Sequence, residues 1–313
     1  MTQPHERRIA AVDLGSNSFR LELGVYDNGR FERTEYLKET VRLGGGIDHN
    51  GHLTMDAMQR GWDCLARFGQ RLVGFDGSNV LAVATQTLRE ACNRDDFLGH
   101  GAKILGFPIH VISGTEEARL IYQGVAQALP HSLERRLVID IGGRSTELIL
   151  GQGAVPEVMD SCHVGSISWS MQFFADQRFV QTSFDAAEAA ARAVLAQVQS
   201  AYRSPAWNTA YGSAGTVSAV SDVLAEAGWP AGAVDRTGLD WLKAQLLKAQ
   251  STHSLHLAGM REDRKAIIGG GLSILCALFD VLDIRQLVLA TGGLRHGLLL
   301  DISGRFEGGH RLP

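Results

Sequence analysis

The sequence predicts an α/β protein of two domains, and three observations support this fold class. At 313 residues the chain exceeds one typical domain and suits two domains of roughly 150 residues each. Short apolar runs alternate with segments of helical spacing along most of the chain, which is typical of strands alternating with helices. A strand that ends in an aspartate and a glycine turn occurs once in each half, at Asp13 and at Asp140.

The composition is that of an ordinary globular protein. Hydrophobic residues make up 45% of the chain and charged residues 20%, which excludes disordered and collagen-like proteins. The net charge of −4 argues against a general nucleic-acid-binding surface, although a local basic channel for a polyanion stays compatible with it. The four cysteines are scattered and form no CxxC pair, so neither a zinc site nor a disulfide scaffold is expected.

The sequence carries no sign of a targeting or membrane segment. Residues 1–8 are polar and charged and lack the apolar core of a signal peptide. The most apolar stretch, 266–279, is shorter than the ~20 residues of a spanning helix and predicts a buried helix. We therefore expect a cytoplasmic protein with no nucleic-acid partner and no stable membrane insertion. The sequence leaves open whether it forms a homodimer.

The first half predicts a strand, a hairpin and then alternating helices and strands. Residues 9–13 form an apolar run before a turn at Gly15, which indicates a buried strand. Residues 20–25 and 31–42 alternate in polarity around Asn28-Gly29, which predicts a hairpin. Helical spacing and apolar runs then predict helices at 54–72, 95–105 and 115–129 and strands at 79–84 and 109–112.

The second half opens in the same way, which suggests an internal duplication. Residues 136–140 predict a strand that ends at Asp140, and a glycine turn leads into a second strand at 148–150. Strands at 208–211 and 287–290 are each followed by a glycine turn and a helix. We expect a boundary near 129–133, with domains 1–129 and 130–313 and a ligand held in a cleft between them. The alternative is that Asp-x-Gly after a strand is common turn chemistry.

Glycine-rich turns after predicted strands are candidates for phosphate binding. Where no Cβ blocks the approach, backbone N–H groups can converge on an anion, and the start of a helix adds its dipole. The candidate residues in these turns are Gly15, Ser16, Asn17, Gly142, Gly143, Ser145, Gly212, Ser213, Gly215 and Thr216, and a fourth turn contains Gly292 and Gly293. A structural turn is the alternative for each one alone. The chain has neither a P-loop nor a GxGxxG pattern.

Three carboxylates, Asp13, Asp140 and Glu147, lie at these turns. Carboxylate and phosphate oxygens together are the ligands that Mg²⁺ prefers, so we expect a magnesium site, with Mn²⁺ as the alternative metal. Local hydrogen bonding within the turns is the competing explanation for each carboxylate.

A Glu-Glu pair at the start of the helix at 115–129 suggests a catalytic base. Ser113 and Glu116 match a capping box, in which Glu116 folds back onto the helix start. Glu117 then has no structural duty and is placed to deprotonate water, with interaction with the helix dipole as the alternative. Arg89 follows the strand at 79–84 and is placed to bind phosphate, with a surface salt bridge as the alternative.

Six segments resemble the signatures of the exopolyphosphatase and guanosine pentaphosphate phosphohydrolase (Ppx/GppA) family, of the acetate kinase, sugar kinase, Hsp70 and actin superfamily. They are residues 11–19, 85–89, 112–120, 138–148, 212–216 and 294–298, so the resemblance covers roughly residues 9–306. It implies two actin-like domains around a central cleft and Mg²⁺-dependent release of a terminal phosphate. Longer members carry an additional helical HD-type domain, which we expect this chain to lack.

The resemblance also assigns roles to individual residues. It implies that Glu117 is the catalytic base, that Asp140 and Glu147 position metal or water, and that Arg89 and Ser145 contact phosphate. The expected phosphate-binding set then also includes Ser18, Arg144 and Thr146.

Arg144 departs from the family pattern, which normally has a third glycine at this position. If the position requires a positive φ, arginine costs roughly 1 kcal/mol or more relative to glycine. The guanidinium then either adds a phosphate contact or obstructs the loop.

The expected function is exopolyphosphatase activity, in which water attacks the terminal phosphate of inorganic polyphosphate in line. The alternatives are hydrolysis of pppGpp to ppGpp and a weakly catalytic regulator that binds an alarmone or polyphosphate. A sugar or acetate kinase is less favoured. Polyphosphate is preferred because basic residues lie in or near the signature segments, namely Arg89, Arg119, Arg144, Arg264, Lys265 and Arg295.

Overall fold

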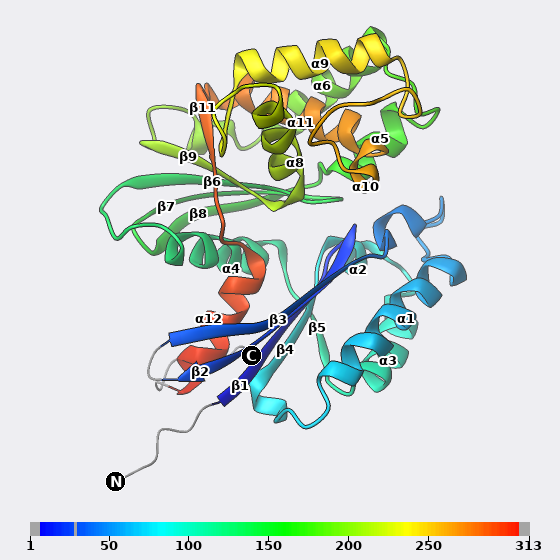
Figure 1. Ribbon diagram of the computed structural model, residues 1–313, viewed down its shortest axis with the longest axis vertical. Coiled ribbons are helices and arrows are strands. Elements are labelled where there is room, and N and C mark those ends of the chain that lie inside the picture. The colour runs from blue at the N-terminus through cyan, green and yellow to red at the C-terminus, as the bar shows by residue number, and fades with distance from the viewer. Residues whose placement is uncertain (1–6, 28–29, 307–313) are drawn as a thin grey trace. The chain divides into compact units, whose positions relative to one another are not determined.

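The computed structural model describes residues 7–27 and 30–306, so the predicted hairpin turn at Asn28-Gly29 lies outside the described residues. The chain divides into two compact units (Figure 1). Unit 1 comprises Met1–Gly124 and Leu294–Pro313, and unit 2 comprises Val125–Gly293. This division differs from the expected one, because the last helix belongs to the first unit and not to the second.

Unit 1 contains a five-stranded sheet in the order β3-β2-β1-β4-β5. Its strands are β1 (Arg7–Leu14), β2 (Ser18–Asp27), β3 (Arg30–Thr40), β4 (Val80–Ala84) and β5 (Ile109–Val111). The first three strands pair antiparallel, whereas β4 and β5 run parallel to β1. All strands that the sequence predicts in this half are therefore present.

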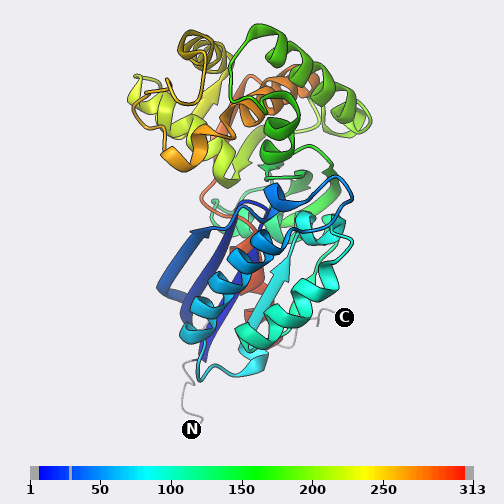
Figure 2. The same cartoon turned by 90° about the vertical axis from the view of Figure 1, so that its right-hand side faces the viewer.

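Helices cover both faces of this sheet, which explains why β1 is buried at every position from Ile9 to Leu14 (Figure 2). The helical segments are η1 (Leu43–Gly46), α1 (Met55–Arg71), η2 (Gly77–Asn79), α2 (Gln86–Glu90), α3 (Arg94–Leu105), α4 (Gly114–Gln127) and α12 (Leu294–Phe306). On one face Val12 and Leu14 join the core formed with α1 and α3. On the other face Ile9 and Ala11 pack with Leu298 of α12.

Helices α4 and α12 pack closely against each other through Gly297. A Cβ atom at Gly297 would lie 2.1 Å from the backbone oxygen of Leu120, so the two helix backbones are in direct contact. Beside this contact, Arg119 of α4 donates to Asp301 of α12 at 2.8 Å. Because α4 begins close to Glu117, the packing of α12 helps to fix the start of the helix that carries the expected base.

Unit 2 contains a six-stranded sheet in the order β10-β11-β9-β6-β7-β8. Its strands are β6 (Arg135–Ile141), β7 (Thr146–Gln152), β8 (Val155–Cys162), β9 (Thr209–Ser213), β10 (Ala233–Asp235) and β11 (Gln286–Leu289). Strands β6, β7 and β8 pair antiparallel, and β9 and β11 run parallel to β6. Apart from the added β10, this repeats the order and directions of the first sheet, as the duplicated sequence pattern predicts.

The helices of unit 2 surround α11 (Ile268–Leu282), which lies at the apolar stretch that predicts a buried helix. The others are α5 (Ser166–Phe173), α6 (Gln181–Leu195), α7 (Gln199–Tyr202), α8 (Ala214–Glu226), α9 (Arg236–Ala249) and α10 (Glu262–Lys265). The three consecutive glycines of α11, at 269–271, allow close packing against Phe174, Ser170 and Thr216. The buried helix is therefore confirmed.

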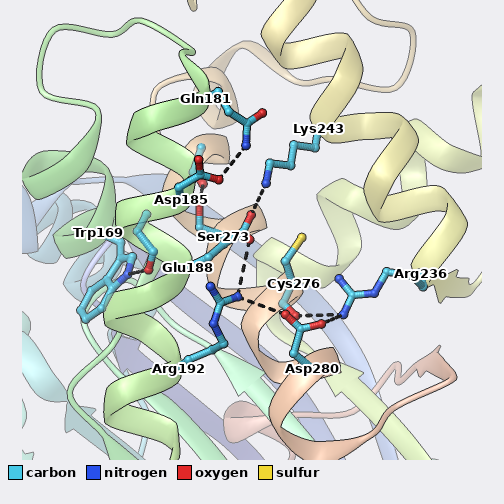
Figure 3. Close-up of polar contacts among 12 residues, drawn as sticks. Trp169, Gln181, Asp185, Glu188, Arg192, Arg236, Lys243, Ser273, Cys276 and Asp280 are labelled. Carbon is cyan, nitrogen blue, oxygen red and sulfur yellow. Dashed lines mark hydrogen bonds and ion pairs between the residues drawn. The ribbon is translucent and has the colours of Figure 1, made fainter.

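A network of ion pairs joins α6, α9 and α11 within unit 2 (Figure 3). Glu188 of α6 accepts from Lys243 of α9 at 2.7 Å. Asp280 of α11 pairs with Arg192 of α6 at 3.1 Å and also with Arg236 of α9. These charges cross-link the three helices around the core.

Gly297→Ala should lower the free energy of unfolding by about 1–3 kcal/mol, because the added methyl group must push α12 away from the backbone of α4. Urea unfolding followed by circular dichroism measures the change. The matched control is Gly304→Ala on the same helix, where a Cβ meets no atom within 4 Å. Alanine there should be neutral or stabilise by up to about 1 kcal/mol. Equal effects of the two substitutions would contradict the close crossing.

Candidate active site

Four polar residues form one row across the sheet of unit 2. Asp140 on β6 is the register partner of Glu147 on β7 and of Ser213 on β9. Glu147 is in turn the register partner of Ser161 on β8. Because register partners on neighbouring strands share a face of the sheet, the order Ser213, Asp140, Glu147, Ser161 places two acids side by side with a serine on each side.

Both acids of this row are hydrogen-bonded by the flanking serines. The hydroxyl of Ser213 donates to Oδ2 of Asp140, and the hydroxyl of Ser161 donates to Oε1 of Glu147 at 2.7 Å. Glu147 and Ser213 are almost completely buried. The two predicted ligands Asp140 and Glu147 are therefore brought together in a polar, largely enclosed position.

The corresponding row in unit 1 has the opposite charge. Asp13 on β1 is the register partner of Arg20 on β2 and of Val83 on β4, and Arg20 pairs with Lys38 on β3. Nη1 of Arg20 lies 2.8 Å from Oδ2 of Asp13, and the Asp13 side chain is only 2% exposed. The same positions of the two sheets thus hold two acidic residues in unit 2, but one acidic and two positively charged residues in unit 1.

This difference decides which of the expected metal ligands fit a divalent cation. Mg²⁺ is usually held by one or two carboxylates together with water and substrate phosphates, which the Asp140–Glu147 pair matches. Asp13 instead faces the guanidinium of Arg20, whose positive charge opposes a cation at that carboxylate. Among the residues that the structure describes, no group of three His, Cys, Asp or Glu side chains is placed to hold a metal. Further ligands would have to come from water or phosphate.

The glycine loop of unit 2 is held by the first turn of α5. The carbonyl of Gly142 accepts from the N–H of Ser166 at 3.0 Å, and the carbonyl of Gly143 accepts from those of Ile167 and Ser168 at 2.7 and 3.2 Å. In a trans peptide the N–H points away from the preceding C=O. The N–H groups of Gly143 and Arg144 are therefore directed away from α5, as a phosphate-binding loop requires.

The loop of unit 1 is held in a similar way by the turn at η1. The carbonyls of Ser16 and Asn17 accept from the N–H groups of Gly44 and Arg42 at 2.8 and 2.9 Å. The hydroxyl of Ser16 also accepts from Thr87 at 2.7 Å. The N–H groups that follow these carbonyls again point away from the supporting segment.

The expected strain at Arg144 is absent. Arg144 is not among the described residues with a positive φ, so its backbone does not require glycine. The position that requires glycine is 165, because a Cβ on Gly165 would lie 2.3–2.5 Å from the N, Cα and C atoms of Arg144. Sequence reasoning missed Gly165 and the start of α5. The small residues Gly165, Ser166 and Ser168 were the available signal.

The turn before α8 combines a helix N-terminus with a buried guanidinium. A Cβ at Gly215 would lie 2.1 Å from Nη2 of Arg264, which is only 6% exposed. A positive charge at the positive end of a helix dipole is unfavourable by itself. The carboxylate of Asp263, 3.9 Å from Nε of Arg264, offsets part of this repulsion. Gly212 instead allows close packing against Val217, and Thr216 donates to the carbonyl of Ile141 at 3.1 Å.

Glu117 and Arg89 form a largely buried ion pair in unit 1. Nη1 of Arg89 lies 2.7 Å from Oε2 of Glu117, with side-chain exposures of 17% and 10%. The same guanidinium donates to the carbonyl of Ile112 at 3.0 Å and to Oε1 of Gln86. Most N–H groups of Arg89 are therefore used to hold Glu117 and its surroundings.

Only half of the expected capping box is present. The hydroxyl of Ser113 accepts from the N–H of Glu116 at 3.1 Å. The Glu116 carboxylate does not fold back onto the helix start, because both of its oxygens accept from Arg119, at 2.6 and 2.8 Å. The ion pair with Arg119 therefore replaces the hydrogen bond between the Glu116 carboxylate and the helix start that a capping box would contain.

Besides Arg89, two more of the basic residues expected to line a polyphosphate groove are neutralised within unit 1. Arg119 pairs with both Glu116 and Asp301, and Arg295 donates to the buried Glu22 at 3.0 Å. These guanidinium groups join helices to one another and to the sheet. The structure therefore gives them structural partners that the sequence did not predict.

Cys162 lies beside the row of Asp140 and Glu147 in unit 2. Its thiol is not a nucleophile. It is the register partner of Thr146, next to Glu147, and is buried. Burial, with Asp160 and Glu147 nearby, raises the pKa of its thiol to about 12. At neutral pH the thiol is therefore protonated and unreactive.

Comparison with known proteins assigns this arrangement to a family. The model of the Ppx/GppA phosphatase family matches residues 26–306. The chain belongs to the Ppx/GppA phosphatase family. It is therefore a hydrolase of this family, whose members are generally metal-dependent.

Similar proteins bear names for two different substrates. A Haemophilus influenzae protein provisionally named an exopolyphosphatase is 40% identical over 96% of this chain and 93% of its own length. A guanosine-5′-triphosphate,3′-diphosphate pyrophosphatase from Vibrio cholerae is also 40% identical, over 94% of this chain. The match spans only 59% of that longer protein. Sequence identity alone thus does not separate the two activities.

The fold is that of solved Ppx/GppA proteins. The crystal structure of an exopolyphosphatase from Cytophaga hutchinsonii superposes with a TM-score of 0.83 at 24% identity, covering 95% of this chain and 98% of the other. This confirms the expected α/β fold class, with one mixed sheet in each of the two units. Within residues 7–27 and 30–306, no helix has the length and apolar character to cross a membrane.

Arg144→Gly should leave the free energy of unfolding unchanged or lower it by up to about 1 kcal/mol, because glycine gains backbone entropy in the unfolded state without relieving strain. Thermal and urea unfolding measure this, with Arg144→Ala as the control that removes the guanidinium but keeps the Cβ. A stabilisation above 1 kcal/mol for glycine alone would show that the backbone at this position is strained.

Proposed function

We propose that this protein is an exopolyphosphatase that releases terminal orthophosphate from inorganic polyphosphate by attack of water. The observation that carries the proposal is the buried Glu117 carboxylate, which Arg89 holds at 2.7 Å at the start of α4. A carboxylate must be ionised to accept a proton, and a neighbouring guanidinium stabilises the ionised form. Glu117 then takes the proton of the attacking water. The protonated, unreactive Cys162 argues against a covalent cysteine intermediate.

The remaining site residues have roles in binding rather than in proton transfer. The acids Asp140 and Glu147 would hold Mg²⁺ or Mn²⁺. The metal, when bound, supplies positive charge to the phosphate oxygens as negative charge shifts during transfer. The loop N–H groups at Gly143 and Arg144 and at Asn17 and Ser18 contact phosphate oxygens. Arg89 mainly positions Glu117, since most of its donors have protein partners.

Polyphosphate is the preferred substrate because both units hold positive groups near their proposed phosphate-binding loops. The buried Arg264 faces Gly215 at the start of α8, and Arg20 and Lys38 lie in one row of unit 1. A chain of phosphates can use repeated charge contacts, whereas a nucleotide also needs a pocket for its base. Hydrolysis of pppGpp remains the second candidate, because relatives of equal identity bear that name.

Glu117→Gln should lower kcat on the order of 10²–10⁴-fold while the protein still binds polyphosphate, since the amide keeps the size of the side chain but cannot accept a proton. Phosphate release and equilibrium binding measure the two effects. Glu116→Gln is the matched control, because the neighbouring carboxylate pairs with Arg119. It should change kcat by no more than a few fold. Similar losses in both variants would show that Glu117 is not the base.

Long-chain polyphosphate should give a higher kcat/KM than tripolyphosphate or pppGpp, and its KM should rise steeply with salt because several phosphate contacts release counterions. Phosphate release from the three substrates at two salt concentrations makes the comparison. A clear preference for pppGpp with little salt dependence would place the second candidate first. Binding of either compound without phosphate release in Mg²⁺ or Mn²⁺ would indicate a regulator.

A further inference from the structure

The acidic row of unit 2 contains two serines that the proposed function does not use. They are Ser161 and Ser213, and the hydroxyl of Ser213, which the sequence suggested for phosphate binding, donates to Asp140 instead. Each is the direct register partner of one acid, and each donates its hydroxyl hydrogen to that acid. Ser213 is 0% exposed, so its bond to Asp140 is protected from competition with water. The four side chains thus form two hydrogen-bonded pairs that lie in one row across four strands.

We propose that Ser213 and Ser161 are positioning residues that hold the carboxylates of Asp140 and Glu147 in place for one divalent cation. The inference rests on the proposed function for the identity of the cation as Mg²⁺ or Mn²⁺. Neither serine is needed to touch the metal or the substrate. Each acts through the carboxylate beside it.

The physical need for the serines follows from the distance between the acids. Adjacent register partners have Cβ atoms about 4.5–5.5 Å apart, and two like charges at such a separation destabilise each other. A hydroxyl that donates to a carboxylate limits the rotation of that carboxylate. A carboxylate has about four acceptor sites in total, so a serine hydroxyl and a cation can share one side chain.

The duplicated sheet supplies an internal comparison. In unit 1 the positions that correspond to Ser213 and Ser161 hold Val83 and Lys38. The two residues between them, Asp13 and Arg20, have opposite charges and stabilise each other directly. Hydroxyl donors therefore flank the row where two acids lie side by side and do not flank it where acid and base are paired. A general role of the serines in strand structure does not explain this difference.

The test is a Mn²⁺ titration of the full-length chain, followed by electron paramagnetic resonance without any phosphate compound. Ser213→Ala and Ser161→Ala should each weaken Mn²⁺ binding by about 10–100-fold, the usual effect of removing a residue that orients a metal ligand. Ser161→Thr keeps a hydroxyl at a half-buried position and should bind within about twofold of the unmodified chain.

The matched control is Ser273→Ala, which removes another buried serine of unit 2, one that donates to the carbonyl of Gly269 within α11. Its Mn²⁺ affinity should be unchanged. Circular dichroism confirms that each variant is folded, and Ser161→Ala carries the test if Ser213→Ala does not fold.

Unchanged Mn²⁺ affinity in the folded alanine variants would overturn the proposal, as would equal weakening by Ser273→Ala or no saturable binding by the unmodified chain. Failure of the proposed function has a different signature. In that case no substrate releases phosphate, yet the serine variants still weaken Mn²⁺ binding. Normal phosphate release with unaltered Mn²⁺ affinity in the serine variants would instead reject only this inference.

Discussion

The candidate site depends on the register of two equivalent antiparallel strand pairs, one in each unit. In unit 1 the pairing of β1 with β2 places Asp13 beside Arg20, and in unit 2 the pairing of β6 with β7 places Asp140 beside Glu147. A shift of one residue would send these side chains to the opposite face of the sheet, so the apolar packing of both faces also fixes the polar row. The short glycine loops that join the strands lie at the end of the same pairs. The register of each strand pair therefore fixes the core packing, the glycine loop and the polar row together.

The strand pairs β1–β2 and β6–β7 share their backbone arrangement, but the side chains of their polar rows differ in charge. The acidic pair of unit 2 suits a divalent cation, and each of its carboxylates accepts a hydrogen bond from a flanking serine. The row of unit 1 suits anions better, since Arg20 neutralises Asp13 and Lys38 adds a further positive charge. The two rows differ at three of their four positions and share only the aspartate on the first strand of each sheet.

The sequence predicted the fold well because its main signals are local. Apolar runs and glycine turns located the strands of both sheets that carry the loops, and helical spacing located α1, α3 and the buried α11. The assignment of α12 to unit 1 is not predictable in this way, because it depends on the contact of Gly297 with Leu120 across the chain. The strand β8, which contributes Ser161, also lacks a clear alternating pattern.

Individual side chains were harder to predict, since their partners come from distant segments. The Glu116 carboxylate binds Arg119 instead of completing the capping box. Arg89 was expected to bind phosphate, but most of its donors are committed to Glu117, Gln86 and the carbonyl of Ile112. The loop that holds Arg144 needs no glycine there, because the close contact falls on Gly165. These outcomes follow from competition among neighbours in space.

The central claim is that the acidic row of unit 2, and not the carboxylate of Asp13, binds the divalent cation. Mn²⁺ binding to Glu147→Gln and Asp13→Asn tests it most directly, because both changes replace a buried carboxylate by an amide of similar size. The account predicts that Glu147→Gln weakens binding by at least tenfold, on the order expected for loss of one ligand, whereas Asp13→Asn binds within about twofold of the unmodified chain. Loss of binding in Asp13→Asn, with little change in Glu147→Gln, would contradict it.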